Sequence, residues 1–220
     1  MMKTLLALTL LFATDWSTLV ARLGKAGPAE LRAIRDELPA DQHYTRGYVA
    51  RALALTAKDD RKALFLEAIE QLEQAVAKQP RSGDAHALLG STYGAAIGAF
   101  PFRAPELGQK SRAALQKAME LEPYNPRVHY LHGSSAFYRP AEYGGGAAVA
   151  EPFLRKALEL FRSEPPEKPW PNWGRFETHL LLGQVLEKQN RRADARAQYE
   201  LALAIAPESE YVRKRLQNVR

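Results

Sequence analysis

Small and apolar residues recur three and four positions apart in four stretches of the chain, each of which is otherwise rich in polar residues. The first stretch carries Ala68, Leu72 and Ala75. The other three sets are Ser111, Leu115 and Ala118, then Ala150, Leu154 and Ala157, then Ala195, Tyr199 and Ala202. Residues at this spacing lie on one face of an α-helix. The pattern therefore predicts four amphipathic helices, three of which are followed by a proline, at Pro80, Pro123 and Pro207.

A second motif, His-x-x-x-Gly, precedes each of these helices. It occurs at His43–Gly47, His86–Gly90, His129–Gly133 and His179–Gly183, so the histidines are 43, 43 and 50 residues apart. A glycine inside a helix costs about 1 kcal/mol relative to alanine. That cost is tolerable where the missing side chain lets a second helix approach closely. The chain is therefore predicted to consist of four helix pairs, each packed at its glycine.

The arrangement resembles the tetratricopeptide repeat family. The motif of that family has a small residue midway along the first helix, then small, large and small residues on the second helix, with a proline after it. The fourth unit matches without gaps, at Leu182, Gly183, Leu186, Ala195, Tyr199, Ala202 and Pro207. The second unit matches at Leu89, Gly90 and Tyr93. The resemblance covers roughly residues 40–210 and implies a solenoid, because each helix pair alone leaves an apolar face that its neighbour must cover.

We expect an all-α fold, a right-handed α-solenoid of about four such helix pairs. The repeats are predicted at residues 41–207, as units 41–80, 83–123, 126–161 and 176–207. Residues 14–40 are expected to form an N-terminal helical segment. Residues 208–220 are expected to form a capping helix that covers the last unit, as solenoids require.

Three long connections depart from the family's pattern. Two of them join the helices of one unit, after Gly90 and after Gly133, and should emerge at one edge of the solenoid. The third, before Gly183, joins successive units and should emerge at the opposite edge unless it folds across. These connections carry Phe100, Phe102, Tyr138, Tyr143, Trp170 and Trp173. The aromatic side chains either bind a partner, since insertions gather on the binding face of repeat proteins, or fill gaps that the insertions create.

The resemblance also implies a concave surface lined by first-helix residues next to the motif positions. Those residues are Tyr44, Tyr48, Arg51, Ser91, Tyr130, Ser134, Phe137, Gln184 and Glu187. Repeat domains that clamp the acidic C-terminus of a chaperone use Lys and Asn there, and this chain lacks that clamp. An aromatic groove suits an extended peptide, because Tyr buries a large area at a low entropic cost. We therefore expect a non-enzymatic module that binds another protein or a peptide.

Two alternatives stay open. Tyr143 to Gly146 opens a predicted helix, and glycine-rich turns at helix N-termini can present several N–H groups to an anion. A small-molecule-binding helper protein would then have its pocket near this turn, whereas a tight turn that uses glycine for positive φ explains the same residues. The other alternative is a purely structural scaffold.

Catalysis, cofactors and metals are not expected. The sequence has no nucleophile elbow, phosphate loop, dinucleotide fingerprint or His-Glu-x-x-His motif. Four of the five histidines share one repeat position, which favours a packing role. The formal charge is +6, but the basic and acidic residues are interleaved, so nucleic-acid binding is not expected either.

The N-terminus has the layout of a secretory signal. Lys3 precedes an apolar run from Leu5 to Ala13, which is too short to span a bilayer. We expect residues 1–13 to be such a signal and the protein to be periplasmic or secreted, with no stable membrane insertion. A cytoplasmic protein with an apolar first helix is the alternative. The absence of cysteine excludes a disulfide framework and is compatible with either compartment. The oligomeric state is not predicted.

Overall fold

The structure, a computed structural model, describes residues 28–165 and 173–219. These residues form ten α-helices and two short 3-10 helices, with no strand among them. The α-helices are α2 (Pro28–Glu37), α3 (His43–Thr56), α4 (Arg61–Lys78), α5 (Gly83–Ala96), α6 (Ala104–Leu121), α7 (Pro126–Tyr138), α8 (Ala147–Arg162), α9 (Arg175–Lys188), α10 (Arg192–Ile205) and α11 (Glu210–Asn218). The 3-10 helices are η1 (Pro101–Arg103) and η2 (Ala141–Tyr143).

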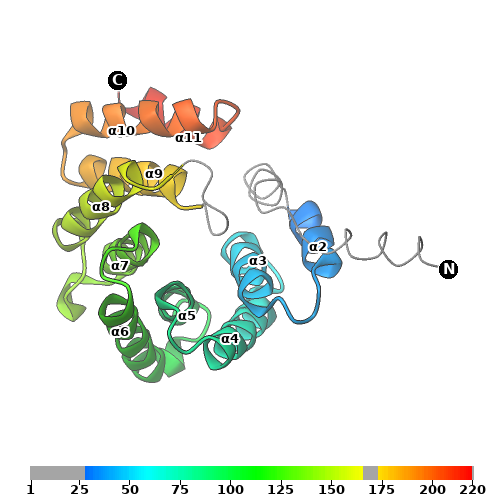
Figure 1. Cartoon of the computed structure of the whole chain (residues 1–220). Helices are drawn as coiled ribbons and strands as arrows, with labels where there is room; N and C mark the ends of the chain where they lie inside the picture. Colours follow the sequence, from blue (N-terminus) through cyan, green and yellow to red (C-terminus); the bar gives the residue numbers. More distant parts are fainter. Residues whose placement is uncertain (1–27, 166–172, 220) are drawn as a thin grey trace.

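Neighbouring helices pack as antiparallel pairs that follow one another around an arc (Figure 1). The pairs are α3 with α4, α5 with α6, α7 with α8, and α9 with α10. The first helix of each pair lies on the inner side of the arc, and the second lies on the outer side. α2 packs on α3 at one end, and α11 packs on α10 at the other. The predicted all-α solenoid of four helix pairs with a capping helix is confirmed.

The glycine of each motif allows its two helices to approach closely, as the sequence pattern predicted. A Cβ atom added to Gly47, Gly90 or Gly133 would lie 2.6 Å, 2.9 Å or 2.7 Å from the leucine side chain opposite. At Gly183 the added atom would lie 2.4 Å from Cε1 of Tyr199. Cβ atoms do not come this close to other heavy atoms, so the four glycines are sterically required. Their unfavourable helix propensity is offset by this packing.

The four equivalent histidines hydrogen-bond within the repeats rather than facing one another. The rings of His86 and His129 bond through Nε2 to the carbonyl oxygens of Pro80 and Pro123, which close the preceding units. His43 and His179 instead bond through Nδ1 to a glutamine on the second helix of their own unit, Gln71 and Gln198. The histidines therefore tie helices together, in keeping with the predicted packing role.

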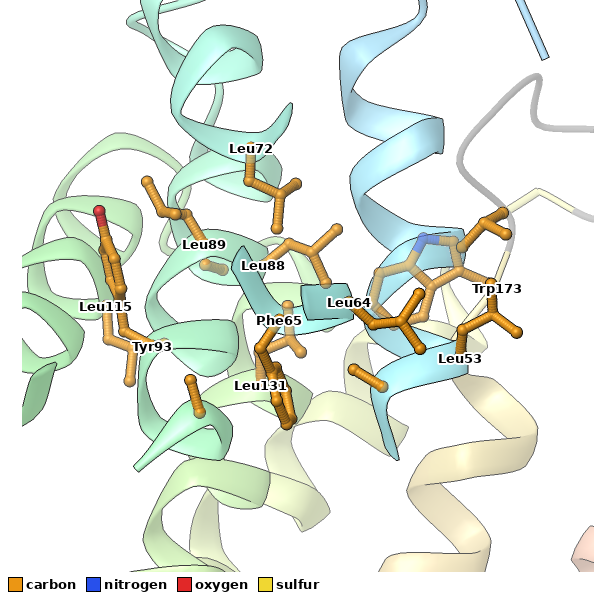
Figure 2. Packing of buried hydrophobic residues seen from close by; sticks show 14 of the residues in the cluster. Leu53, Leu64, Phe65, Leu72, Leu88, Leu89, Tyr93, Leu115, Leu131 and Trp173 are labelled. Atoms are coloured by element: carbon orange, nitrogen blue, oxygen red, sulfur yellow. The ribbon is translucent and has the colours of Figure 1, made fainter. Parts of the chain in front are cut away.

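Apolar side chains from all four pairs form a core in two clusters. The first extends from α2 to α7 and contains Leu72 and Leu115, which face the glycines (Figure 2). It also contains Trp173, whose indole lies beside Leu53 of α3. The second cluster joins α7 to α11 and includes Tyr199 and Val212. Trp173 thus links the third long connection to the core of the first units.

The insertions after Gly90 and Gly133 are short, partly helical turns at the positions predicted for loops. η1 leads directly into α6, and η2 precedes α8. Phe102 is fully exposed, whereas Phe100 is partly buried against the core. Tyr138 and Tyr143 are 70% and 68% exposed. Some of the loop aromatics thus pack against the core, as one alternative predicted, and others face solvent.

Several predictions concern residues outside the described part of the chain. They are the signal at residues 1–13, the start of the N-terminal segment at residues 14–27, and Trp170. Within the described ranges, none of the helices combines the length and the apolar character needed to cross a bilayer.

Candidate binding surface

Trp173 covers the N-terminal half of the inner face of the arc. Its side chain is 3% exposed, and its ring centroid lies 5.1 Å from that of Tyr48 and 6.0 Å from that of Tyr130. Tyr44 is also packed against the same core cluster. Trp173, the last residue of the third connection, therefore lies on the inner face and not at the opposite edge. Three of the predicted groove residues therefore pack against other residues of the same chain: Tyr44, Tyr48 and Tyr130.

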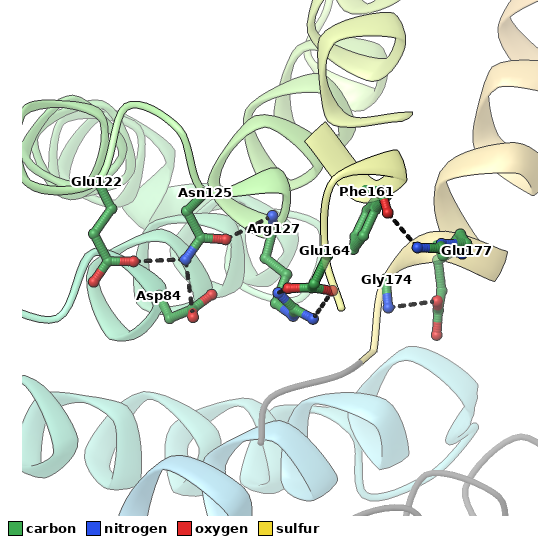
Figure 3. Close-up of polar contacts among 9 residues, drawn as sticks. Asp84, Glu122, Asn125, Arg127, Phe161, Glu164, Gly174 and Glu177 are labelled. Carbon is green, nitrogen blue, oxygen red and sulfur yellow. Dashed lines mark hydrogen bonds and ion pairs between the residues drawn. The ribbon is translucent and has the colours of Figure 1, made fainter. Parts of the chain in front are cut away.

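Gly174 lies between Trp173 and the first residue of α9 and sets the direction of the chain there. Its φ angle of +110° lies in the left-handed region, and a Cβ atom there would be 2.9 Å from Cζ of Phe161. Its N–H donates to Oε2 of Glu177 at 3.1 Å (Figure 3). Its carbonyl accepts from Oγ1 of Thr178 at 2.6 Å. A glycine is therefore required both by the backbone angle and by the space available.

A buried ion pair anchors the start of the same connection. Nη1 and Nη2 of Arg127 donate to the two carboxylate oxygens of Glu164 at 2.7 Å and 2.8 Å (Figure 3). The Arg127 side chain is fully buried, and that of Glu164 is 10% exposed. Two parallel hydrogen bonds fix the geometry of the pair, and removing one partner of such a pair typically costs about 3–5 kcal/mol.

A chain of hydrogen bonds links this pair to the second unit. The side-chain amide of Asn125 donates to Glu122 at 2.6 Å and to Asp84 at 3.0 Å, and its oxygen accepts from the N–H of Arg127 (Figure 3). Glu122 also accepts from the N–H of Gly83 at 2.8 Å. These contacts connect the first turn of α5 to the N-terminus of α7.

Burial at the inner face shifts the pKa values of three side chains. Burial raises the pKa of the Glu177 carboxyl group, while the N–H groups of Glu177 itself and Gly174 and the charges of Arg127 and Arg51 oppose the shift. Burial also raises the pKa of the hydroxyls of Tyr48 and Tyr130, and the charge of Glu177 adds to both shifts. The two phenols are therefore neutral at pH 7.

Three further predicted groove residues are hydrogen-bonded or buried within the chain: Arg51, Ser91 and Ser134. Nη2 of Arg51 donates to Oγ of Ser91 at 3.1 Å, which links α3 to α5. Ser91 and Ser134 are only 4% and 6% exposed. These serines leave little side-chain surface for a partner.

The C-terminal half of the inner face is open. A hollow of about 480 Å³ lies between α7, α9 and α11, and three predicted residues line it: Phe137, Gln184 and Glu187. The other lining residues are Tyr138, Lys188, Tyr211 and Arg215. The structure therefore brings together the C-terminal members of the predicted groove and separates them from the N-terminal members.

Polar contacts fix the shape of this hollow. Glu187 accepts from the hydroxyl of Tyr199 at 2.7 Å and pairs with Arg215 at 2.9 Å. Nε2 of Gln184 donates to the hydroxyl of Tyr211 at 3.2 Å. The ammonium group of Lys188 lies 5.4 Å from the centre of the Phe137 ring, a distance typical of a cation–π contact. The walls are thus aromatic, with two cations and one carboxylate.

Two solved structures share this arrangement of helix pairs. No protein-family model and no curated protein matches the sequence. The HusA haemophore from Porphyromonas gingivalis is 24% identical, covers 80% of this chain and 94% of its own, and has a TM-score of 0.66. A thermophilic TPR protein from Thermus thermophilus is 21% identical over 92% of each chain, with a TM-score of 0.57. The chain has the tetratricopeptide repeat fold.

The tetratricopeptide motif predicted only some of the residues that line this hollow. Lys188 follows the mapped position Glu187, and Tyr211 and Arg215 belong to the capping helix, which the motif does not describe. Their spacing of four residues was the available signal, because it places both on one face of a helix. Tyr138 was predicted only as a loop aromatic, and it ends α7.

The residues of the Tyr143 turn are largely open to solvent. Tyr143 is 68% exposed, and a Cβ atom added at Gly144 or Gly146 would meet nothing within 4 Å. The described residues also contain no group of three or more His, Cys, Asp or Glu side chains that could hold a metal ion.

Proposed function

We propose that this protein is a non-enzymatic binding module that holds a segment of another polypeptide in the hollow between α7, α9 and α11. The observation that carries the proposal is the exposure of aromatic side chains around an open concave site. Tyr138 is 70% exposed and Tyr211 is 53% exposed, and both line the hollow with Phe137. Exposed aromatic residues of this kind supply most of the energy at many protein interfaces.

The charges of the hollow favour a partner segment that places an acidic residue beside a large apolar one. Arg215 is paired with Glu187, whereas Lys188 has no carboxylate partner among residues 28–165 and 173–219. The hollow therefore carries a net positive charge. An acidic side chain would pair with Lys188 while its apolar neighbour packs against Phe137 and Tyr211.

The remaining predicted groove residues support this surface from within the chain. Tyr44, Tyr48 and Tyr130 pack against the core that contains Trp173. Arg51 and Ser91 link α3 to α5, and Ser134 is buried. We assign them to shaping the inner face. Direct contact with the partner belongs to Phe137, Gln184 and Glu187.

The capture of a partner by paired variants tests this assignment. Tyr138→Ala with Tyr211→Ala removes two aromatic walls of the hollow. Phe102→Ala with Tyr124→Ala removes two aromatic residues that are at least as exposed but lie outside the hollow, at 101% and 79% exposure. Affinity capture from the producing cells should lose its partner with the first double variant and retain it with the second. Equal capture by both would place the partner elsewhere.

Haem is a second candidate occupant, because one structure with this fold is described as a haemophore. The hollow offers aromatic rings, the phenol groups of Tyr138 and Tyr211, and the cations Lys188 and Arg215. Phenolate oxygen is a known haem-iron ligand, and cations would pair with the haem propionates. Titration with haemin, followed by its absorbance spectrum, separates the two candidates. A saturable spectral change that Tyr211→Phe abolishes supports haem, and an unchanged spectrum supports the polypeptide.

We further propose that residues 1–13 direct export and that the protein acts in the periplasm or outside the cell. The support is the lysine followed by an apolar run at the start of the sequence. N-terminal sequencing of the protein from its own cells tests this. A mature chain that begins beyond residue 13 is expected, and an intact N-terminus on cytoplasmic protein would refute export.

A further inference from the structure

The junction between the third and fourth units differs from the two junctions before it. In the earlier junctions a proline lies six residues before the repeat histidine, and its carbonyl accepts from that ring at 3.0 Å for His86 and 2.7 Å for His129. The residue six positions before His179 is Trp173, which is buried in the core on the inner face. His179 therefore lacks the equivalent carbonyl partner and bonds to Gln198 on α10 at 2.9 Å instead.

A hollow occupies this junction on the outer side, between α8, α9 and α10. Its volume is about 260 Å³, and it is distinct from the hollow on the inner face because the two share no residue. Its lining residues are Arg155, Leu158, Glu159, Phe161, Arg162, Arg175, His179, Leu182, Gln198 and Leu201. The ring of His179 lies among these residues with Nδ1 engaged by Gln198, which leaves Nε2 as the second polar atom of the ring.

Three arginines give this hollow an excess of positive charge. Arg155 pairs with Glu151 at 2.8 Å, and Arg175 donates to the carbonyl of Phe161. Arg162 makes no ion pair or hydrogen bond within the described parts of the chain. The one carboxylate in the lining, Glu159, is already paired with Lys156 at 2.8 Å. The guanidinium of Arg162 and the remaining donors of Arg175 are thus available to an anion.

Apolar side chains from the same three helices complete the lining. They are Leu158 of α8, Leu182 of α9 and Leu201 of α10, and Leu201 is 48% exposed. Leu182 is buried, but an inorganic ion would leave Leu158 and Leu201 in contact with water. A ligand that carries both an anionic group and an apolar part would cover these two leucines and gain free energy by removing apolar surface from water.

We propose that this hollow binds an organic anion, with its carboxylate or phosphate group held by Arg162 and Arg175 and its apolar part packed against Leu158 and Leu201. Planar guanidinium groups suit both oxyanions, because they donate two parallel hydrogen bonds. The site is independent of polypeptide binding on the inner face.

His179 supplies a spectroscopic reporter for the site. Burial lowers the pKa of its imidazole, and the positive charges of Arg175 and Arg162 add to the effect, although the bond to Gln198 opposes it. The other charged groups in the lining are Arg155 and Glu159 of α8. A bound anion would offset the arginine charges, so the pKa of His179 should rise when the ligand binds.

The test is an NMR titration of the whole protein with phenyl phosphate and, separately, phenylacetate. At least one of them should bind saturably, raise the pKa of His179 and bind at least threefold more tightly than inorganic phosphate. Arg162→Gln should weaken binding at least fivefold. Arg196→Gln removes another exposed arginine, on α10 outside the hollow, and should leave binding unchanged.

The outcomes separate clearly. The probe that binds more tightly shows whether the site prefers a phosphate or a carboxylate group. A preference for either probe supports the site. An unchanged His179 pKa with both probes, or equal binding by Arg162→Gln and wild type, overturns the proposal. Circular dichroism of each variant shows whether its fold is intact, and if Arg162→Gln does not fold, Arg162→Lys replaces it with the same expected direction.

Discussion

At the scale of single residues, complementarity between a glycine and a large side chain was predictable, whereas hydrogen-bond partners were not. Gly183 and Tyr199 belong to one unit, and their relation follows from two helix periodicities alone. The partner of each repeat histidine depends on the turn that precedes it. His86 and His129 bond to a proline carbonyl, but His179 bonds to Gln198 because Trp173 has replaced the tight turn.

The close approach at Gly183 predicts a steric cost for any side chain there. Gly183→Ala would place Cβ 2.4 Å from Cε1 of Tyr199 and should destabilise the protein by about 1–3 kcal/mol. Gly108→Ala is the matched control, because its Cβ would meet only the flexible end of Arg112 at 3.6 Å. That variant should gain up to about 1 kcal/mol from helix propensity. Urea denaturation measures the free energy of unfolding of both variants. Equal changes in the two variants would contradict the close packing at Gly183.

The raised pKa of Glu177 leads us to expect that the stability of the protein depends on pH. Because burial raises the pKa of its carboxyl group in the folded state, the contribution of Glu177 to stability is complete below the pKa of the unfolded chain. The contribution is lost as pH rises through the folded-state pKa. The free energy of unfolding of wild type relative to Glu177→Gln should therefore fall from about pH 4 upward. Urea denaturation at a series of pH values measures this difference, and a difference that grows with pH would contradict the burial.

At the scale of elements, the helices were predictable, but the position of Trp173 at the end of the third connection was not. Each helix follows from a local periodicity, and the four pairs lie at residues 43–78, 83–121, 126–162 and 175–205. The connection before α9 was expected at the edge opposite to the first two insertions unless it folded across. The positions of its two described ends depend on Gly174, on the buried pair of Arg127 with Glu164, and on the space for an indole beside Tyr48. These contacts join residues that are far apart in the sequence.

Because Trp173 is buried in the core, we expect its side chain to contribute to the global stability of the protein. Trp173→Ala should reduce the free energy of unfolding by about 3–5 kcal/mol, because the side chain is 3% exposed and belongs to the main core cluster. Phe102→Ala, at a fully exposed aromatic residue on another connection, should change it by less than about 0.5 kcal/mol. Thermal or urea unfolding measures both variants. A small effect at Trp173 would show that the connection detaches from the inner face in solution.

At the scale of the whole molecule, stacked pairs create one concave face that the chain itself divides. The motif predicted the inner helices and the residues on them, but not which half of the face would be covered. Trp173 fills the half next to α3, and α11 adds Tyr211 and Arg215 to the open half. The capping helix therefore both covers the last apolar face and contributes to the proposed binding surface.

The most direct test of the proposed binding surface is site-specific photocrosslinking with the full chain in its own cells. A benzophenone amino acid replaces Tyr138, which lines the hollow, or Tyr124, which is 79% exposed but lies outside it. A crosslinked polypeptide partner should form at position 138 and not at position 124. Crosslinking to the same partner at both positions with equal yield, or at position 124 alone, would contradict partner binding in the hollow.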